Sequence, residues 1–184
     1  MLKLVKGEKV ASLLLSRELI ASRVQELAVQ INQDYAGRQV TLLGTLSGAN
    51  IFLADLAREL TIDTRLDFMK VSSYAGTETV GQVSLIHPPM LDLEGAHVII
   101  IEDIIDTGHT AVFLRNFLQD QKAASVAMCS LLSKPSRRVV QNVECEYLGF
   151  EVENVFVVGY GLDYNQRYRN LPYIGILELE KEVE

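Results

Sequence analysis

Residues that can bind a phosphorylated sugar are concentrated in one segment, VIIIEDIIDTGHT, which spans residues 98–110. Glu102 and Asp103 follow an apolar run, and Asp106 comes directly before the small polar turn at 107–110. Paired carboxylates bind a hard divalent cation such as Mg2+ or accept hydrogen bonds from sugar hydroxyls. A glycine turn leading into a helix presents unpaired backbone N–H groups, which bind phosphate well. The segment therefore predicts a site for a sugar phosphate and a cation.

The elements around this segment would place its acids at a ligand-binding edge. The β-branched run 98–101 predicts a strand buried at the centre of a parallel sheet, and in open α/β sheets ligands bind outside the carboxyl ends of the strands. Residues 111–118 have apolar side chains at helical spacing, so a helix is expected after the turn. The G-x-x-x-x-G-K-[ST] pattern of a Walker A loop is missing. The alternative is a solvated acidic loop between a strand and a helix.

The rest of the chain alternates predicted strands with predicted helices. Helices are expected at 17–31 and 50–60, and strands at 39–43, 65–71, 82–86, 124–132, 146–150, 155–158 and 174–179. This order predicts right-handed βαβ crossovers and an α/β fold with a mainly parallel twisted sheet flanked by helices. A chain of 184 residues that is 48% hydrophobic suits one compact domain over residues 1–184.

Charge and composition exclude several classes of protein. The formal net charge of -7 argues against a large surface for nucleic acid or an anionic membrane. No secretory signal or run of membrane-spanning length is recognisable, so a cytoplasmic location is expected. Cys129 and Cys145 are too far apart for a C-x-x-C pair, and the three histidines offer no zinc-ligand spacing. We expect both thiols to be reduced and buried.

Two further loops have small or polar residues suited to ligand binding. In LLGTLSGAN, residues 42–50, a predicted strand leads into two glycines that would let the backbone approach a ligand closely. An ordinary βα turn would have the same composition. The polar stretch VSSYAGTETVG, residues 71–81, predicts a mobile hairpin loop or simply a solvated hairpin tip.

Two later segments follow predicted strands and carry side chains suited to recognising a ligand. Lys134 lies in SKPSRR directly after a buried strand, although a lone lysine usually lies at the surface. In FVVGYGLDYNQRYR, residues 156–169, a strand ends in a glycine-flanked turn with an acid and several basic residues. Phe156 alone would be expected to pack in the core, because most strand aromatics are buried. Arg137 and Arg138 are interpreted as solvated.

These segments resemble, in the same order and over nearly the whole chain, the motifs of one enzyme family. EDIIDTGHT resembles the phosphoribosyl pyrophosphate (PRPP) motif of the type I phosphoribosyltransferases, and FVVGYGLDY and the Lys134 region are similar to those of the hypoxanthine-guanine phosphoribosyltransferases. The resemblance implies the type I fold with a small hood formed by N- and C-terminal segments. It implies a purine-salvage reaction that moves 5-phosphoribosyl from PRPP to hypoxanthine or guanine, giving IMP or GMP and pyrophosphate, with Mg2+ as cofactor.

The resemblance also implies the site residues. PRPP and its 5-phosphate would be bound by Glu102, Asp103, Asp106, Thr107, Gly108, His109 and Thr110. Pyrophosphate would be bound by Leu46, Ser47, Gly48 and Arg169, under a lid that carries Ser73 and Tyr74. The purine would be bound by Lys134, Phe156, Val157 and Asp163, and the metal ligands would be Glu102, Asp103 and Asp163.

Each implied role has a chemical reason. Asp106, the acid nearest the phosphate turn, is the candidate general base and would also stabilise a ribosyl cation. A lysine ammonium donates to an oxo group and not to an amino group, so Lys134 would select 6-oxopurines over adenine. Phe156 would stack on the base while the Val157 backbone reads its edge. Backbone N–H groups, rather than the His109 side chain, would hold the 5-phosphate.

One residue departs from the family pattern, and three alternative functions also remain open. The pyrophosphate loop of the family often contains a non-proline cis peptide, which here would join Leu46 to Ser47. Ser47 stands where relatives commonly have Lys or Arg, so a cationic contact to pyrophosphate is lost. The alternatives are a xanthine- or guanine-preferring transferase, a PRPP-sensing regulator that binds nucleic acid, and an inactive paralogue. Homologous enzymes form dimers or tetramers, so a homodimer or homotetramer is expected.

Overall fold

The computed structural model describes residues 8–73 and 83–179, and a six-stranded sheet forms the centre of this structure. The strand order is β4-β3-β2-β5-β6-β7. The strands are β2 (Val40–Thr45), β3 (Thr64–Ser73), β4 (Val83–His87), β5 (His97–Ile105), β6 (Ser125–Ser133) and β7 (Tyr147–Glu151). All neighbours pair in parallel except β3 and β4, which are antiparallel. The expected mainly parallel α/β sheet is therefore confirmed.

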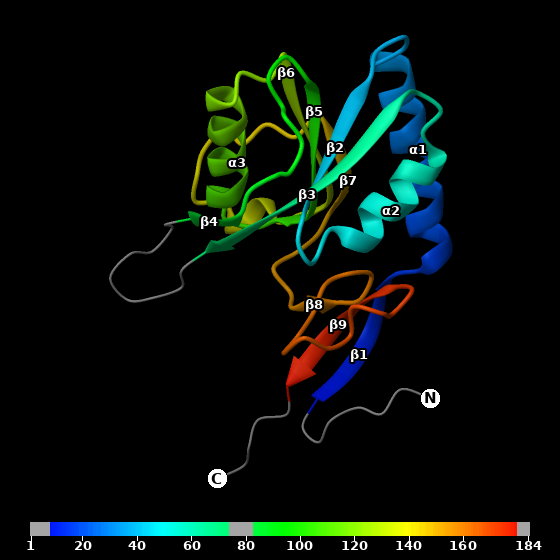
Figure 1. Cartoon of the computed structure of the whole chain (residues 1–184). Coiled ribbons are helices and arrows are strands. Elements are labelled where there is room, and N and C mark those ends of the chain that lie inside the picture. The colour runs from blue at the N-terminus through cyan, green and yellow to red at the C-terminus, as the bar shows by residue number, and fades with distance from the viewer. Residues whose placement is uncertain (1–7, 74–82, 180–184) are drawn as a thin grey trace.

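Helices cover both faces of this sheet. Figure 1 shows α1 (Arg17–Asp34) and α2 (Asn50–Glu59) on one side and α3 (His109–Asp120) on the other. Alternate residues of a strand point to opposite faces, and accordingly Ile99 packs in the cluster with α1 and α2 whereas Ile100 packs in the cluster with α3. The central strand is thus buried on both faces, as its apolar run predicts.

A second, three-stranded antiparallel sheet joins the two ends of the described chain. Its order is β1 (Glu8–Leu15), β9 (Ile174–Leu179), β8 (Val157–Val158). It lies beyond one end of the main sheet, next to the loops that follow the parallel strands (Figure 1). This is the small hood expected from the N- and C-terminal segments. Strand β1 itself was not predicted, because its pairing partner β9 lies at the other end of the chain.

Several boundaries differ from the expected ones. The central strand extends to Ile105, because its pairing with β6 continues past the acids. Glu102 and Asp103 consequently lie within the last residues of the strand rather than after it. The strand expected at 155–158 is reduced to β8, and a short 3-10 helix (Pro135–Arg137) follows Lys134. No helix among the described residues is long and apolar enough to cross a membrane.

Candidate active site

The two adjacent acids of β5 are held in a buried, electrostatically unfavourable place. Glu102 is 6% exposed, and its Oε2 accepts a hydrogen bond of 2.7 Å from Thr45 Oγ1. Its Oε1 is buried and has no hydrogen-bond partner within the described residues. Burial, and then the neighbouring Asp103 carboxylate, raise the pKa of Glu102 to about 8. A cation or a hydroxyl donor at this point would satisfy the free oxygen.

Asp103 is likewise buried in surroundings that disfavour its charge, and it faces the loop after β2. Burial raises the pKa of Asp103 to about 6, although its Oδ1 accepts a hydrogen bond of 2.8 Å from the Ile104 N–H. A Cβ added to Gly48 would overlap Asp103 Oδ2. The loop backbone therefore approaches the carboxylate as closely as only glycine allows, which explains the residue type at this position.

The turn after β5 has the geometry of a phosphate-binding helix N-terminus. Gly108 is the N-cap of α3 with φ of +95°, a left-handed conformation that favours glycine. A Cβ there would lie 2.7 Å from Val143 Cγ2. The Thr107 carbonyl accepts hydrogen bonds from the N–H groups of Val139 and Val140 at 3.0 and 3.1 Å. These two hydrogen bonds fix the turn, and the first N–H groups of α3 remain available for a ligand.

Asp106 is more exposed than the two acids of β5. Its carboxylate is 41% exposed, and Oδ1 accepts a hydrogen bond of 3.1 Å from Arg137 Nε. Arg137 is exposed, as expected of a solvated residue, and it also has this ion-pair partner. Arg138 is likewise held, since its Nη2 donates a hydrogen bond of 2.8 Å to Ser133 Oγ. Both arginines follow Lys134, so the Lys134 segment and the candidate base are neighbours.

The loop predicted to bind pyrophosphate meets a turn of the hood. The Leu46–Ser47 peptide bond is cis, as the resemblance implied. A Cβ added to Gly161 would overlap the Gly48 carbonyl oxygen, so the two backbones are in contact. Arg169 Nη1 donates a hydrogen bond of 2.7 Å to the Gly161 carbonyl. The segments that hold Gly48 and Arg169 thus come together beside Asp103.

Asp163 and Arg169 lie in this corner but contact each other. Arg169 Nη2 and Asp163 Oδ1 are 2.8 Å apart, and Asp163 Oδ2 accepts a hydrogen bond of 2.9 Å from the Gln166 N–H. The charges of both residues act on Asp103, with Arg169 lowering and Asp163 raising its pKa. A metal ion at Asp163 would have to compete with this ion pair.

The residues predicted to bind a purine lie at the junction of β6 and the hood. Lys134 is 9% exposed, and its Nζ donates a hydrogen bond of 2.8 Å to the Val155 carbonyl. Burial lowers the pKa of Lys134, while Asp106 acts in the opposite direction. An ammonium has three donors, so this bond leaves others for a ligand. The lysine is therefore a buried donor and not a surface residue.

Phe156 and Val157 present a ring and a backbone edge beside this lysine. Phe156 is 52% exposed and packs edge-on against Tyr164, with ring centroids 5.5 Å apart, so the core position expected of a strand aromatic is wrong here. Leu177 N–H donates to the Phe156 carbonyl at 2.8 Å. Because backbone groups alternate in direction in an antiparallel pair, those of Val157 point away from β9, on the open edge of β8.

The sequence did not single out one supporting residue, and one predicted feature lies beyond the described chain. Thr45 holds Glu102, and its place at the carboxyl end of β2 was the only available signal. Ser73 ends β3, whereas Tyr74 lies outside the described residues, as does the rest of the predicted lid. Among the described residues, no group of three or more His, Cys, Asp or Glu side chains is arranged to hold a metal ion.

The chain combines a glycine-capped helix start, paired acids on the central strand and a hood next to the strand ends, an arrangement suited to an enzyme that binds a phosphorylated sugar. The family model of the phosphoribosyl transferase domain matches residues 11–165, and the chain belongs to that family. Among curated proteins, it is 43% identical over 172 residues to the hypoxanthine-guanine phosphoribosyltransferases of Streptococcus thermophilus (strain CNRZ 1066) and Streptococcus pneumoniae (strain ATCC BAA-255 / R6), covering 93% of this chain and 95% of each relative.

Solved structures of named enzymes have the same fold. A hypoxanthine-guanine phosphoribosyltransferase from Bacillus anthracis superimposes with a TM-score of 0.87 at 38% identity, covering 93% of this chain and 99% of the other. A hypoxanthine phosphoribosyltransferase from Staphylococcus aureus gives a TM-score of 0.87 at 41% identity, covering 91% of each chain. The chain is thus a phosphoribosyltransferase with the type I fold.

Proposed function

We propose that this enzyme transfers the 5-phosphoribosyl group of PRPP to hypoxanthine and to guanine, giving IMP or GMP and pyrophosphate, in purine salvage. The observation that carries the choice of base is Lys134, a buried ammonium beside an exposed aromatic ring and an open backbone edge. The names of the curated relatives support the same choice.

The purine would lie between Phe156 and the Lys134 ammonium. Phe156 offers an exposed flat face for stacking, and the Val157 N–H and carbonyl would pair with the edge of the base. Lys134 donates to the 6-oxo group. Adenine presents an amino group at the same place, and two donors would then face each other without an acceptor. The site therefore favours 6-oxopurines.

The phosphoribosyl part of PRPP would lie along the carboxyl end of β5. Its 5-phosphate accepts hydrogen bonds from the backbone at the start of α3, within 107–110. Glu102 and Asp103 hold the ribose hydroxyls, directly or through Mg2+. The buried, unpartnered Glu102 Oε1 fits a cation or a hydroxyl. Since the described residues form no metal site by themselves, the remaining ligands of Mg2+ would be substrate oxygens and water, the usual arrangement for this ion.

Pyrophosphate would leave into the corner between the 46–48 loop and Arg169. Bound Mg2+ would neutralise the departing charge as a Lewis acid, with Asp163 as a ligand of a second ion. Arg169 contributes a cation at this corner, and Gly48 lets the backbone approach. Ser47 carries no charge, so we expect weaker pyrophosphate binding than a lysine at this position would give.

Asp106 would act as the general base. As the purine nitrogen attacks the anomeric carbon, its proton passes to the Asp106 carboxylate, and the same negative charge stabilises the cationic ribose. The carboxylate is 41% exposed and so accessible to a ligand. Arg137, which now pairs with Asp106, would remain its neighbour on the side of Lys134.

Parallel assays with hypoxanthine, guanine, xanthine and adenine test this proposal. We expect turnover with PRPP, Mg2+ and hypoxanthine or guanine, and little with adenine. Lys134→Met should remove most of the preference for 6-oxopurines while Glu94→Gln, an exposed change elsewhere, should not. Turnover with xanthine alone would favour the xanthine-preferring alternative. Binding of PRPP with no turnover on any base would favour a regulator or an inactive paralogue.

We further propose a homodimer or homotetramer, located in the cytoplasm. The relatives support the first point, since a solved structure of the Trypanosoma cruzi hypoxanthine phosphoribosyl transferase addresses the role of its C-terminal region in the oligomeric state of that enzyme. The free thiols of Cys129 and Cys145 support the cytoplasmic location, because cysteines usually stay reduced there. Light scattering that gives the mass of a single chain at assay concentration would refute the oligomer.

A further inference from the structure

The turn that connects the purine and pyrophosphate sides of the site has an unusual backbone. Gly159, Tyr160 and Gly161 all have positive φ, at +104°, +49° and +101°. Glycine adopts this region without cost, whereas a tyrosine does so only when its surroundings hold it there. Backbone hydrogen bonds stabilise this conformation in part. The Tyr160 N–H donates to the Leu171 carbonyl at 2.8 Å, and the Gly161 N–H donates to the Arg169 carbonyl at 2.9 Å.

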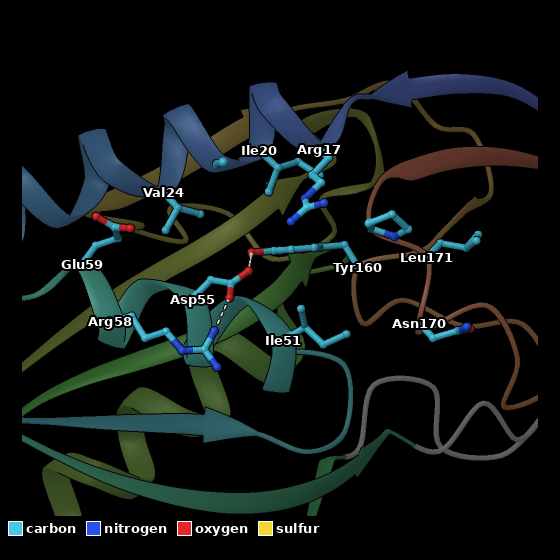
Figure 2. A pocket seen from close by; sticks show the side chains of 12 residues that line it. Arg17, Ile20, Val24, Ile51, Asp55, Arg58, Glu59, Tyr160, Asn170 and Leu171 are labelled. Carbon is cyan, nitrogen blue, oxygen red and sulfur yellow. Dashed lines mark hydrogen bonds and ion pairs between the residues drawn. The ribbon is translucent and has the colours of Figure 1, made fainter.

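The Tyr160 side chain also fixes this turn, through a hydrogen bond to a residue of α2. Figure 2 shows its ring extending from the hood turn toward α2, where its hydroxyl donates a hydrogen bond of 2.7 Å to Asp55 Oδ2. Asp55 Oδ1 in turn accepts from Arg58 Nη1 at 2.7 Å. Tyr160 is 6% exposed and borders a pocket of about 480 Å3 between α1, α2 and residues 170–172. Burial, followed by the bond to Asp55, raises the pKa of Tyr160, so the phenol remains a donor.

Gly161, the residue after Tyr160, links the tyrosine to the pyrophosphate corner. Gly161 lies against the Gly48 carbonyl, and its own carbonyl accepts from Arg169. Gly48 in turn lies against Asp103. A displacement of Tyr160 would therefore move Gly161 directly and Arg169 through it, because backbone contacts this close cannot be kept while one partner shifts.

We propose that the Tyr160–Asp55 hydrogen bond is a positioning contact for the reaction: it fixes the 159–163 turn to α2 so that Gly161 stays on Gly48 and Arg169 stays beside Asp103. The hydrogen bond itself lies on the α2 side, and Tyr160 is joined to the pyrophosphate corner through the next residue, Gly161. The proposal rests on the proposed function in assigning that corner to pyrophosphate. It extends the function by making the affinity for pyrophosphate and PRPP depend on a contact made on the α2 side of the molecule.

The chain offers a matched control for this contact. Tyr147 is also 6% exposed, and its hydroxyl also donates a hydrogen bond of 2.7 Å to a carboxylate, Asp34 Oδ2. That bond joins β7 to the end of α1 and has no link to the 159–163 turn. Tyr160→Phe and Tyr147→Phe each remove one hydroxyl from a buried Tyr–Asp pair. A loss of stability alone would therefore affect both variants, whereas a loss of positioning would affect only the first.

The test measures binding of pyrophosphate with Mg2+ by calorimetry, together with kcat and KM for PRPP. We expect Tyr160→Phe to weaken pyrophosphate binding and to raise the KM for PRPP by about 10-fold, which corresponds to about 1.4 kcal/mol, while kcat changes much less. Tyr147→Phe should leave all three within about 2-fold of the unmodified enzyme. Asp55→Ala should reproduce the effect of Tyr160→Phe, and Asp55→Asn, which keeps an acceptor oxygen, should restore most of the affinity.

Hydrogen exchange of the unliganded protein gives a readout that needs no substrate. The Tyr160 and Gly161 amides should lose protection in Tyr160→Phe and keep it in Tyr147→Phe. Equal effects of the two tyrosine variants on pyrophosphate binding, or no pyrophosphate binding by the unmodified enzyme, would overturn the positioning role. Failure of the proposed function looks different: the unmodified enzyme would bind pyrophosphate and show the Tyr160 effect, yet transfer nothing to hypoxanthine or guanine.

Discussion

The buried Glu102 should make the stability of the ligand-free enzyme fall as the pH rises. Its pKa is about 8 in the folded protein against 4.5 for the ordinary group. Below pH 4.5 the carboxyl is protonated in both states and has no effect. Above it the unfolded chain ionises while the folded one stays protonated, so unfolding becomes easier by about 1.4 kcal/mol per pH unit. By pH 8 the loss from this residue would be on the order of 4 kcal/mol.

Urea unfolding in metal-free buffer between pH 5 and pH 8.5, followed by circular dichroism, measures this effect. Glu102→Gln removes the charge at nearly constant shape, so its free energy of unfolding should exceed that of the unmodified enzyme by an amount that grows with pH. The exposed change Glu94→Gln is the control and should leave the profile unchanged. Mg2+ with PRPP should recover the loss, since a bound ligand favours the ionised folded form. Parallel profiles for the unmodified enzyme and Glu102→Gln would refute the reasoning.

Three further predictions follow from the site. Asp106→Asn should leave PRPP binding by calorimetry nearly unchanged and lower kcat about 100-fold or more; an unchanged kcat would exclude Asp106 as the base. Gly48→Ala must displace the loop or the Asp103 carboxylate, so KM for PRPP should rise at least about 10-fold, whereas Gly37→Ala, where a side chain meets open space, should alter stability alone. Phe156→Leu should raise KM for hypoxanthine about 5-fold or more with little change in stability, because the ring is exposed; a large drop in melting temperature would instead indicate a core role.

Local patterns were enough to predict the main sheet and much of the site. The β-branched run before Glu102 predicted a central buried strand, and Gly108 after it predicted the turn into a helix; both are properties of neighbouring residues. The parallel order of the strands then followed from their alternation with helices. The family resemblance supplied the remaining site residues, and the cis bond at Leu46–Ser47 agrees with it.

What the sequence could not predict depends on partners far along the chain. Strand β1 exists because β9 pairs with it across more than 150 residues. Phe156 taken alone would be expected in the core, and only the family resemblance predicted a ring available for stacking, which agrees with its exposure. Arg137 is exposed, as expected, but the sequence does not predict its hydrogen bond to Asp106, 31 residues earlier in the chain. Neither the pairing of β1 nor the contact of Arg137 has a local signal.

The acid pair shows how the core and the active site depend on each other. Strand β5 is fully buried on both faces just before Glu102. The free energy gained by burying these apolar side chains offsets the cost of keeping an unpartnered carboxylate oxygen out of water. The same burial destabilises the folded protein at neutral pH and leaves Glu102 Oε1 without a hydrogen-bond partner among the described residues. A cation or a ribose hydroxyl can therefore bind this oxygen without displacing another partner. Glu102→Gln should therefore give a more stable enzyme that binds PRPP less well, the trade expected where an active site holds groups in an unfavourable state.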